Sequence, residues 1–214
     1  MGTPLLPSQV LWYVLALAYS ADLSPGSILR GHMSKPSTHV ALSERIHSTA
    51  RVVADFPING VSFVDLFHAL ALDASILRSI TDCFVDRYRD LNLDAICGID
   101  SRGFVFGAAV AYALNKPLIP IRKQGKLPPP VSHFSYSCEY GSGTLETCQH
   151  YFDGKKQVVI LDDVLATGGS MRTAINLIES TGTKVIEVGT VVRISALNGH
   201  NLLDPTPWYS LTDF

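Results

Sequence analysis

Apolar positions along the chain form two kinds of segment, short continuous runs and longer stretches in which they recur every three or four residues. After Asp73 such a recurrence predicts an amphipathic helix, capped by Asp73, that continues to about Leu91. The short apolar runs, which are typical of buried strands, lie at 95–99, 117–121, 157–163, 184–194 and 208–211. Helices are expected between them at 103–114 and 170–180. This alternation predicts an α/β fold with a parallel sheet flanked by helices.

Two regions fit this pattern less well. Apolar positions predict a helix over residues 40–54 with Ser43 as its N-cap, ended by a turn that contains Pro57, Asn59 and Gly60. The short alternating stretch 61–65 after it fits either a strand or an extended arm. From 122 to 151 the periodicity disappears in Gly-, Pro- and Ser-rich sequence, and we expect an irregular segment that acts as a lid.

Composition narrows the class of protein. The 214 residues, 47% hydrophobic and 17% charged, are typical of a globular chain with one large domain or a domain with a small appendage. A net charge of −2 predicts no general affinity for nucleic acid, so any anion site must be local. The four cysteines form no C-x-x-C pair, which favours a reducing compartment, and we expect a cytoplasmic protein.

The N-terminal residues 10–19 are almost purely apolar but are too few to span a bilayer, and no Lys or Arg precedes them. Three interpretations stay open: a weak targeting segment, an arm that binds a partner, or sequence outside the natural core, which Met33 as a downstream start would favour. We expect residues 1–39 to be an extension with no catalytic role, residues 40–214 to form the domain, and no membrane association.

The stretch 158–171, VVILDDVLATGGSM, carries the clearest chemistry. A strand that leads into a glycine turn and a helix N-terminus presents unpaired N–H groups and the positive end of the helix dipole, which together bind a phosphate. The spacing is neither that of a Walker A loop nor that of a G-x-G-x-x-G loop. Asp162 and Asp163 could accept hydrogen bonds from two vicinal hydroxyls, so the pair and the turn predict a ribose 5-phosphate site. The alternative is an acidic strand end before an ordinary turn.

Residues 159–170 resemble the phosphoribosyl-diphosphate motif of type I phosphoribosyltransferases. Four other segments are similar to the adenine phosphoribosyltransferase family, in the same order along residues 40–214. They are a base-binding arm at 55–65, a diphosphate loop at 98–104, a basic segment at 121–128 and the surroundings of an acid/base glutamate at 136–141. Two departures, Asn59 for the usual Pro and Ser170 for the commoner Thr, keep a turn and a hydroxyl.

The resemblance implies a type I phosphoribosyltransferase-like parallel sheet flanked by helices, with a small N-terminal hood. It also implies the transfer of a phosphoribosyl group from 5-phospho-α-D-ribose 1-diphosphate to adenine, giving AMP and diphosphate. Mg²⁺ would be held mainly by the substrate's diphosphate and water, with no direct side-chain ligand. A homodimer is the implied assembly.

The resemblance further assigns a role to each matching residue. Glu139 would exchange a proton with the purine, and Arg102 would act with it in catalysis. The residues implied to bind phosphoribosyl diphosphate are Asp162, Asp163, Ala166, Thr167, Gly168, Gly169, Ser170, Asp100, Ser101, Arg122, Lys123 and Lys126. Adenine would contact Ser62, Phe63, Val64 and Val164.

The residue types are consistent with these roles. Arg102, Arg122, Lys123 and Lys126 place cations at the carboxyl edge of the sheet, where they would stabilise a departing diphosphate. A solvated surface is the alternative for Arg122 and Lys123 taken alone. Glu139, between two tyrosines, could have a raised pKa, or could be a solvent-facing hairpin residue.

Phe63 fits either stacking on a flat base or core packing. Two other functions also stay open. A related enzyme could act on a 6-oxopurine or xanthine, and a non-catalytic regulator of the same fold could only sense phosphoribosyl diphosphate. The regulator would need neither a proton-transfer residue nor a complete set of diphosphate-binding cations.

Overall fold

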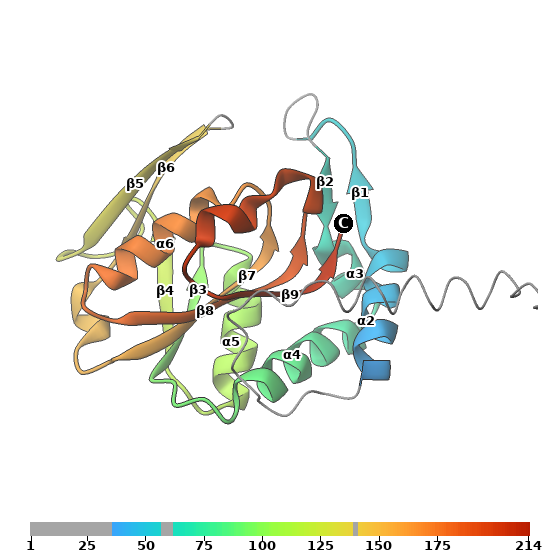
Figure 1. Cartoon of the computed structure of the whole chain (residues 1–214), viewed down its shortest axis with the longest axis horizontal. Coiled ribbons are helices and arrows are strands. Elements are labelled where there is room, and N and C mark those ends of the chain that lie inside the picture. Colours follow the sequence, from blue (N-terminus) through green and yellow to red (C-terminus); the bar gives the residue numbers. More distant parts are fainter. Residues whose placement is uncertain (1–35, 57–61, 139–140) are drawn as a thin grey trace, which may run out of the picture. The chain divides into compact units, whose positions relative to one another are not determined.

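The computed structural model of the chain describes residues 36–56, 62–138 and 141–214 (Figure 1). Helices are labelled α, strands β and 3-10 helices η. The described elements are α2 (Pro36–Thr49), β1 (Arg51–Val53), β2 (Phe63–Asp65), α3 (Leu66–Leu72), α4 (Ala74–Tyr88), β3 (Ala95–Ile99), α5 (Gly103–Ala113), β4 (Leu118–Lys123), β5 (Ser132–Cys138), β6 (Gly141–Thr147), η1 (Gln149–Phe152), β7 (Gln157–Leu165), α6 (Gly169–Glu179), β8 (Lys184–Arg193), η2 (Ser195–Leu197), η3 (Gly199–Leu203) and β9 (Trp208–Asp213). None of these helices is long and apolar enough to cross a membrane.

The described strands other than β1 and β2 form one seven-stranded sheet in the order β5-β6-β4-β3-β7-β8-β9. Strands β4, β3, β7, β8 and β9 are parallel, as the sequence pattern predicts. Strand β6 is antiparallel to β4, and β5 is antiparallel to β6. The central strands β3 and β7 pair with Ala95 opposite Val158 and Gly98 opposite Leu161.

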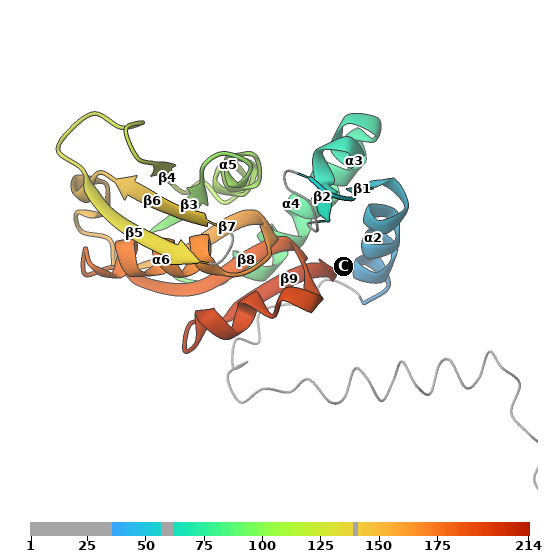
Figure 2. The same cartoon turned by 90° about the horizontal axis from the view of Figure 1, so that it is seen from above.

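Both faces of the central sheet are covered, which explains why its strands are continuously apolar. On one face, Ile96, Val159 and Leu161 pack in a core with residues of α2, α3, α4 and α5. On the other face, Cys97 and Ile160 belong to a second core with residues of α6. Figure 2 shows α5 and α6 on opposite sides of the sheet.

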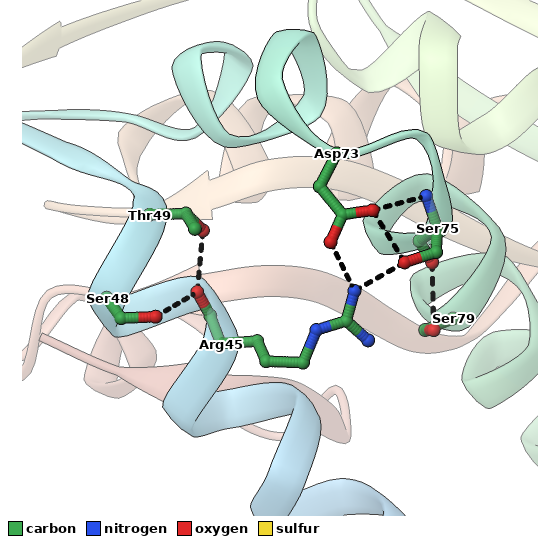
Figure 3. Close-up of polar contacts among 6 residues, drawn as sticks. All are labelled: Arg45, Ser48, Thr49, Asp73, Ser75 and Ser79. Atoms are coloured by element: carbon green, nitrogen blue, oxygen red, sulfur yellow. Dashed lines mark hydrogen bonds and ion pairs between the residues drawn. The ribbon is translucent and has the colours of Figure 1, made fainter.

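The N-terminal hood consists of α2, β1, β2 and α3, in which β1 and β2 form a small antiparallel sheet. Helix α2 is held to the start of α4 by the Arg45 guanidinium, which donates to Asp73 Oδ2 at 2.7 Å and to Ser75 Oγ at 2.5 Å (Figure 3). Asp73 also accepts the Ser75 N–H at 2.8 Å, so the predicted N-cap of α4 is confirmed. The cap residue therefore also anchors the hood to the main domain.

The helix predicted over residues 40–54 is wrong in part. Helix α2 runs from Pro36 to Thr49 instead of over 40–54, and Ser43 lies in its interior, with its Oγ 2.6 Å from Thr212 Oγ1. The predicted last turn is strand β1, in which Val52 and Val53 pair with β2. The apolar spacing continued past the helix end, but β-branched neighbours with a strand partner favour an extended backbone.

The segment 122–151, predicted to be irregular, contains the end of β4, the paired strands β5 and β6, and η1. Strand β5 has the sequence SHFSYSC, in which small polar residues alternate with larger ones, so it lacks the apolar run that marks a buried strand. Its regularity comes from its ladder with β6, in which Phe134 is opposite Leu145. Within the described part of this segment, residues 124–131 between β4 and β5 and Cys148 before η1 have no helix or strand structure.

Candidate active site

Three loops meet at the carboxyl edge of the parallel sheet because β4, β3 and β7 are neighbours. They are residues 100–102 after β3, 124–131 after β4 and 166–168 after β7. This edge is where open α/β sheets bind ligands. The order of the loops along the chain does not bring them together. The order of the strands in the sheet does, because it makes β4, β3 and β7 neighbours.

The expected phosphate loop, residues 166–168, joins β7 to α6. Gly168 caps α6 with φ of +82°, a left-handed conformation that favours glycine. The first N–H groups of α6, which begins at Gly169, have no partner within the helix and point to the loop with the positive end of the helix dipole. Predicted residues 166–170 therefore form one turn with the geometry of an anion site.

Gly199 in η3 supports this turn from behind, which the sequence did not predict. A Cβ on Gly199 would overlap the Ala166 carbonyl oxygen and would lie 2.7 Å from Gly168 N. A Cβ on Gly168 would likewise overlap the Gly199 carbonyl oxygen. The two backbones touch, and only glycine fits on either side.

Asp162 and Asp163 lie near the carboxyl end of β7. The Asp163 N–H donates to Asp162 Oδ1 at 2.9 Å. Asp163 is buried, 1% exposed, and its Oδ2 lies 2.9 Å from Arg102 Nε. That ion pair lacks hydrogen-bond alignment, since Asp163 Oδ2 has no hydrogen bond from any described residue. The acidic pair thus holds a cation but keeps acceptor capacity.

The environment raises the pKa of both carboxyl groups. For Asp162 the largest cause is burial, and the charge of Asp163 adds to it. For Asp163 burial again raises the pKa, while the charge of Arg102 acts in the opposite direction. Asp162 also lies against the start of α5, where a Cβ on Gly103 would be 2.9 Å from its Oδ1. In the absence of a ligand, ionising both of these poorly hydrated carboxyl groups lowers the stability of the folded protein.

We expect Asp162→Asn to be more stable to heat than the wild type at pH 7. Ionising Asp162 is harder in the folded protein than in the unfolded chain, so stability falls as the pH rises from about 4 through the raised pKa. Asparagine removes this penalty and keeps an oxygen for the Asp163 N–H, and each 1 kcal/mol gained shifts Tm by about 2–4 °C. Calorimetry between pH 3 and pH 8 measures the difference, which should vanish at the acid end.

The control for this substitution is Asp153→Asn, because Asp153 is an exposed aspartate at the end of η1, outside β7. It should leave Tm nearly unchanged at every pH. A loss of stability in Asp162→Asn at pH 7, or a difference independent of pH, would contradict the prediction.

The end of β4 and the loop after it present the predicted cations. Arg122 Nε lies 3.2 Å from Asp100 Oδ2, and its Nη1 donates to the Lys126 carbonyl oxygen at 3.1 Å. Lys123 and Lys126 have exposed side chains. Asp100 and Ser101, joined by a cis peptide bond, precede Arg102 at the end of β3.

Glu146 in β6 is a second residue that the sequence analysis missed. It is 3% exposed, and its carboxylate accepts three backbone N–H groups of the segment 124–131, called the cation loop, from Gly125, Lys126 and Leu127. Burial by itself would raise the pKa of Glu146, but these three donors lower it below its ordinary value. The sequence carried no signal for Glu146, because it is opposite Arg122 only through the β4–β6 ladder, and strand β6 was not predicted.

On the hood side, Arg102 also reaches Phe63. The Arg102 guanidinium carbon lies 5.0 Å from the centre of the Phe63 ring, and Phe56 meets the same ring edge-on at 5.2 Å. Phe63 is only half-buried, whereas Val64 is buried and Ser62 is exposed. Arg102 therefore connects the predicted base-binding arm to the acidic pair of β7, and Phe63 is not a plain core residue.

Other predicted residues take less defined places. Val164 is partly buried and packs on the core beneath α4 and α5. Glu139, the predicted acid/base residue, lies outside the described residues. Among those that the structure describes, no three His, Cys, Asp or Glu side chains are grouped so that they could hold a metal ion.

Comparisons with known proteins agree with this geometry. Residues 69–211 match the family model of the phosphoribosyl transferase domain. The chain is 43% identical over 173 residues to the adenine phosphoribosyltransferase of Burkholderia pseudomallei strain 668. The matched residues make up 80% of this chain and 92% of the relative.

Two solved structures have the same fold. Adenine phosphoribosyltransferase from Thermoanaerobacter pseudethanolicus has a TM-score of 0.75 at 34% identity, covering 80% of this chain and 99% of that one. The enzyme from Saccharomyces cerevisiae, complexed with an imino-altritol bisphosphate and adenine, has a TM-score of 0.72 at 28% identity and covers 80% and 99%.

Proposed function

The chain belongs to the phosphoribosyl transferase family, among its adenine phosphoribosyltransferases, and from this premise we propose how its residues carry out the reaction. The enzyme transfers the 5-phosphoribosyl group of phosphoribosyl diphosphate to adenine, giving AMP and diphosphate, a step of purine salvage. The observation that carries the proposed mechanism is the meeting of the glycine turn, the acidic pair and Arg102 at the ends of β7 and β3.

In this mechanism the turn at 166–170 binds the 5-phosphate through backbone N–H groups at the start of α6. Asp162 and Asp163 accept hydrogen bonds from the ribose 2- and 3-hydroxyls. Their negative charge also favours the positive charge that develops on the ribose as its bond to diphosphate breaks. The carboxylates precede the turn by only a few residues of the chain. This closeness supports the assignment, because one ribose 5-phosphate could contact the turn with its phosphate and the carboxylates with its hydroxyls.

The departing diphosphate takes the electrons of the broken C1–O bond and is stabilised by cations. We assign this role to Arg102, Arg122, Lys123 and Lys126, with the loop of Asp100 and Ser101 beside them. Arg122 is already oriented by Asp100 and by the Lys126 carbonyl. Mg²⁺ would come with the substrate, held by diphosphate oxygens and water, and would neutralise part of the leaving group's charge.

Adenine N9 forms the new bond to C1, and Glu139 takes part in moving the proton that the purine loses. The base would stack on Phe63 and pack against Val164, with main-chain groups of Ser62 and Val64 at its edge. Main-chain donors and acceptors there would distinguish a 6-amino group from a 6-oxo group. The half-exposed ring of Phe63 beside Arg102 supports this location of the base.

A base-competition assay tests the function. With phosphoribosyl diphosphate and Mg²⁺, kcat/KM for adenine should exceed that for hypoxanthine, guanine or orotate by at least about tenfold, because mismatched donors and acceptors are left unpaired. Spectrophotometry follows nucleotide formation. Preference for a 6-oxopurine would overturn the choice of base, and tight binding without turnover of any base would identify a sensor instead of an enzyme.

We also propose a homodimer that works in the cytoplasm. Helix α5 contains no charged residue, and its Tyr112 is 90% exposed. In the dimer, a second copy would cover this apolar face of α5. Sedimentation analysis tests the dimer. The buried thiols of Cys83, Cys97 and Cys148 are free, which fits a reducing compartment.

We propose residues 40–214 as the transferase domain and 1–39 as an extension outside catalysis, although α2 begins slightly earlier, at Pro36. A chain that starts at Gly31 keeps the whole of α2 and should retain the kcat/KM of the full chain. A large loss would assign the extension a part in the reaction.

A further inference from the structure

Glu146 is buried beneath the cation loop and binds it with both carboxylate oxygens. Gly125 N donates to Oε2 at 3.0 Å, and Lys126 N and Leu127 N donate to Oε1 at 2.7 Å each. Three consecutive N–H groups directed at one carboxylate fix the backbone of this segment, where Gly125 has φ of +80°. Hydrogen bonds to an ionised acceptor are roughly twice as strong as those between neutral groups.

The same loop is tied to the sheet from its other side by Arg122. The Arg122 guanidinium contacts Asp100 Oδ2 at 3.2 Å and the Lys126 carbonyl oxygen at 3.1 Å. Lys126 is therefore held at both its N–H, by Glu146, and its carbonyl, by Arg122. Glu146 and Arg122 are opposite residues of the β4–β6 ladder. Both contacts to the loop therefore come from the same pair of hydrogen-bonded strands.

Proton transfer by Glu146 does not fit this arrangement. Both oxygens are occupied by N–H donors, and the side chain is almost entirely covered. A carboxylate that accepts three N–H groups favours its ionised form, whereas a general acid must release and regain a proton near neutral pH. The role of Glu146 must be exerted through the loop that it holds.

We propose that Glu146 is a positioning residue for the transfer: it fixes the backbone at residues 125–127 so that Arg122 and Lys126 face the diphosphate. This inference rests on the proposed function, in which those cations bind the leaving group. Pre-arranged cations stabilise developing charge without first having to be ordered. Glu146 thus contributes to substrate binding although it does not touch the substrate.

For Glu146→Gln, a purely electrostatic role and a positioning role predict changes of opposite sign in the affinity for diphosphate. Removal of a negative charge near three cations should tighten diphosphate binding if only the field matters. Positioning predicts weaker binding, because the glutamine amide oxygen can accept two of the N–H groups, while its NH₂ group opposes the third. The sign of the change therefore separates the two.

The experiment compares Glu146→Gln with Glu179→Gln, which removes the same charge from an exposed site at the end of α6. Calorimetric titration with inorganic diphosphate and Mg²⁺ should give a dissociation constant about tenfold higher for Glu146→Gln, with KM for phosphoribosyl diphosphate raised alike and KM for adenine within about twofold. Glu179→Gln should match the wild type. Unchanged or tighter diphosphate binding in folded Glu146→Gln overturns the proposal.

A measurement on the wild type remains decisive if the variant does not fold. The amide hydrogens of Gly125, Lys126 and Leu127 should exchange slowly without ligand, since each is bound to Glu146. Fast exchange at all three overturns the proposal. If the wild type makes no nucleotide from adenine, the proposed function fails, but the diphosphate titration and the exchange rates still test the role of Glu146.

Discussion

Arg102→Ala is expected to lower kcat/KM for phosphoribosyl diphosphate by about 10²–10³-fold, the range found when one group that stabilises transition-state charge is removed. Arg102 is placed between the two substrates' predicted positions, 2.9 Å from Asp163 at the end of β7 and 5.0 Å from the Phe63 ring. Its loss removes a cation for diphosphate and a neighbour of the base. Steady-state kinetics with each substrate varied in turn would measure the effect.

The same substitution should also destabilise the fold, because Asp163 would be left as a buried carboxylate without its cation. Removal of one partner from a buried pair typically costs about 3–5 kcal/mol, and partial exposure of Arg102 places the expected loss below that range. Combining Arg102→Ala with Asp163→Asn should recover stability while activity stays low. Recovery of activity in the double variant would show that Arg102 acts only as a counter-ion.

Arg89→Ala is a matched control, since Arg89 pairs with Asp86 on the surface at the C-terminal end of α4. Exposed pairs of this kind contribute little to stability, and we expect wild-type kinetics. If Arg102→Ala retained kcat/KM within about threefold of wild type, the assignment of Arg102 to the transfer would be wrong.

Gly199→Ala is expected to raise KM for phosphoribosyl diphosphate by about 100-fold, because a shift of roughly 1 Å in a binding group can reduce activity by that factor. The added methyl would overlap the Ala166 carbonyl oxygen, so the phosphate turn or η3 must move. KM for adenine should change much less. Titration with ribose 5-phosphate would report directly on the phosphate turn.

Gly182→Ala serves as its control. Gly182 has φ of +84° with nothing within 4 Å of an added Cβ, so alanine there strains the backbone without touching the turn. It should lower Tm slightly and leave both KM values near those of the wild type. Equal effects of the two substitutions on KM would mean that Gly199 influences binding only through general stability.

The sequence predicted those parts of the site that are contiguous in the chain. The passage from β7 through Gly168 into α6 has its strand signal, turn residue and helix start within fourteen residues, and the Asp73 cap is equally local. The parallel sheet followed from the regular alternation of strands and helices. These features depend on short-range chemistry that each segment carries by itself.

The missing parts depend on partners distant in the chain. Gly199 matters only because η3 lies behind the phosphate turn, and Glu146 only because β6 lies beside β4. The strand β5 was not predicted since its order arises from pairing with β6, and 51–53 changed from helix to strand for the same reason. The contact of Arg102 with Phe63 likewise required the hood to be in place.

The mutual contact of Gly168 and Gly199 has an evolutionary consequence. Each glycine excludes a side chain from the other, so neither position can drift alone while the two backbones keep their separation. A change at Gly199 would have to follow a change in the length or path of the segment before it, residues 195–198. A short 3-10 helix with no recognisable motif should therefore diverge as slowly as the glycine turn that it supports.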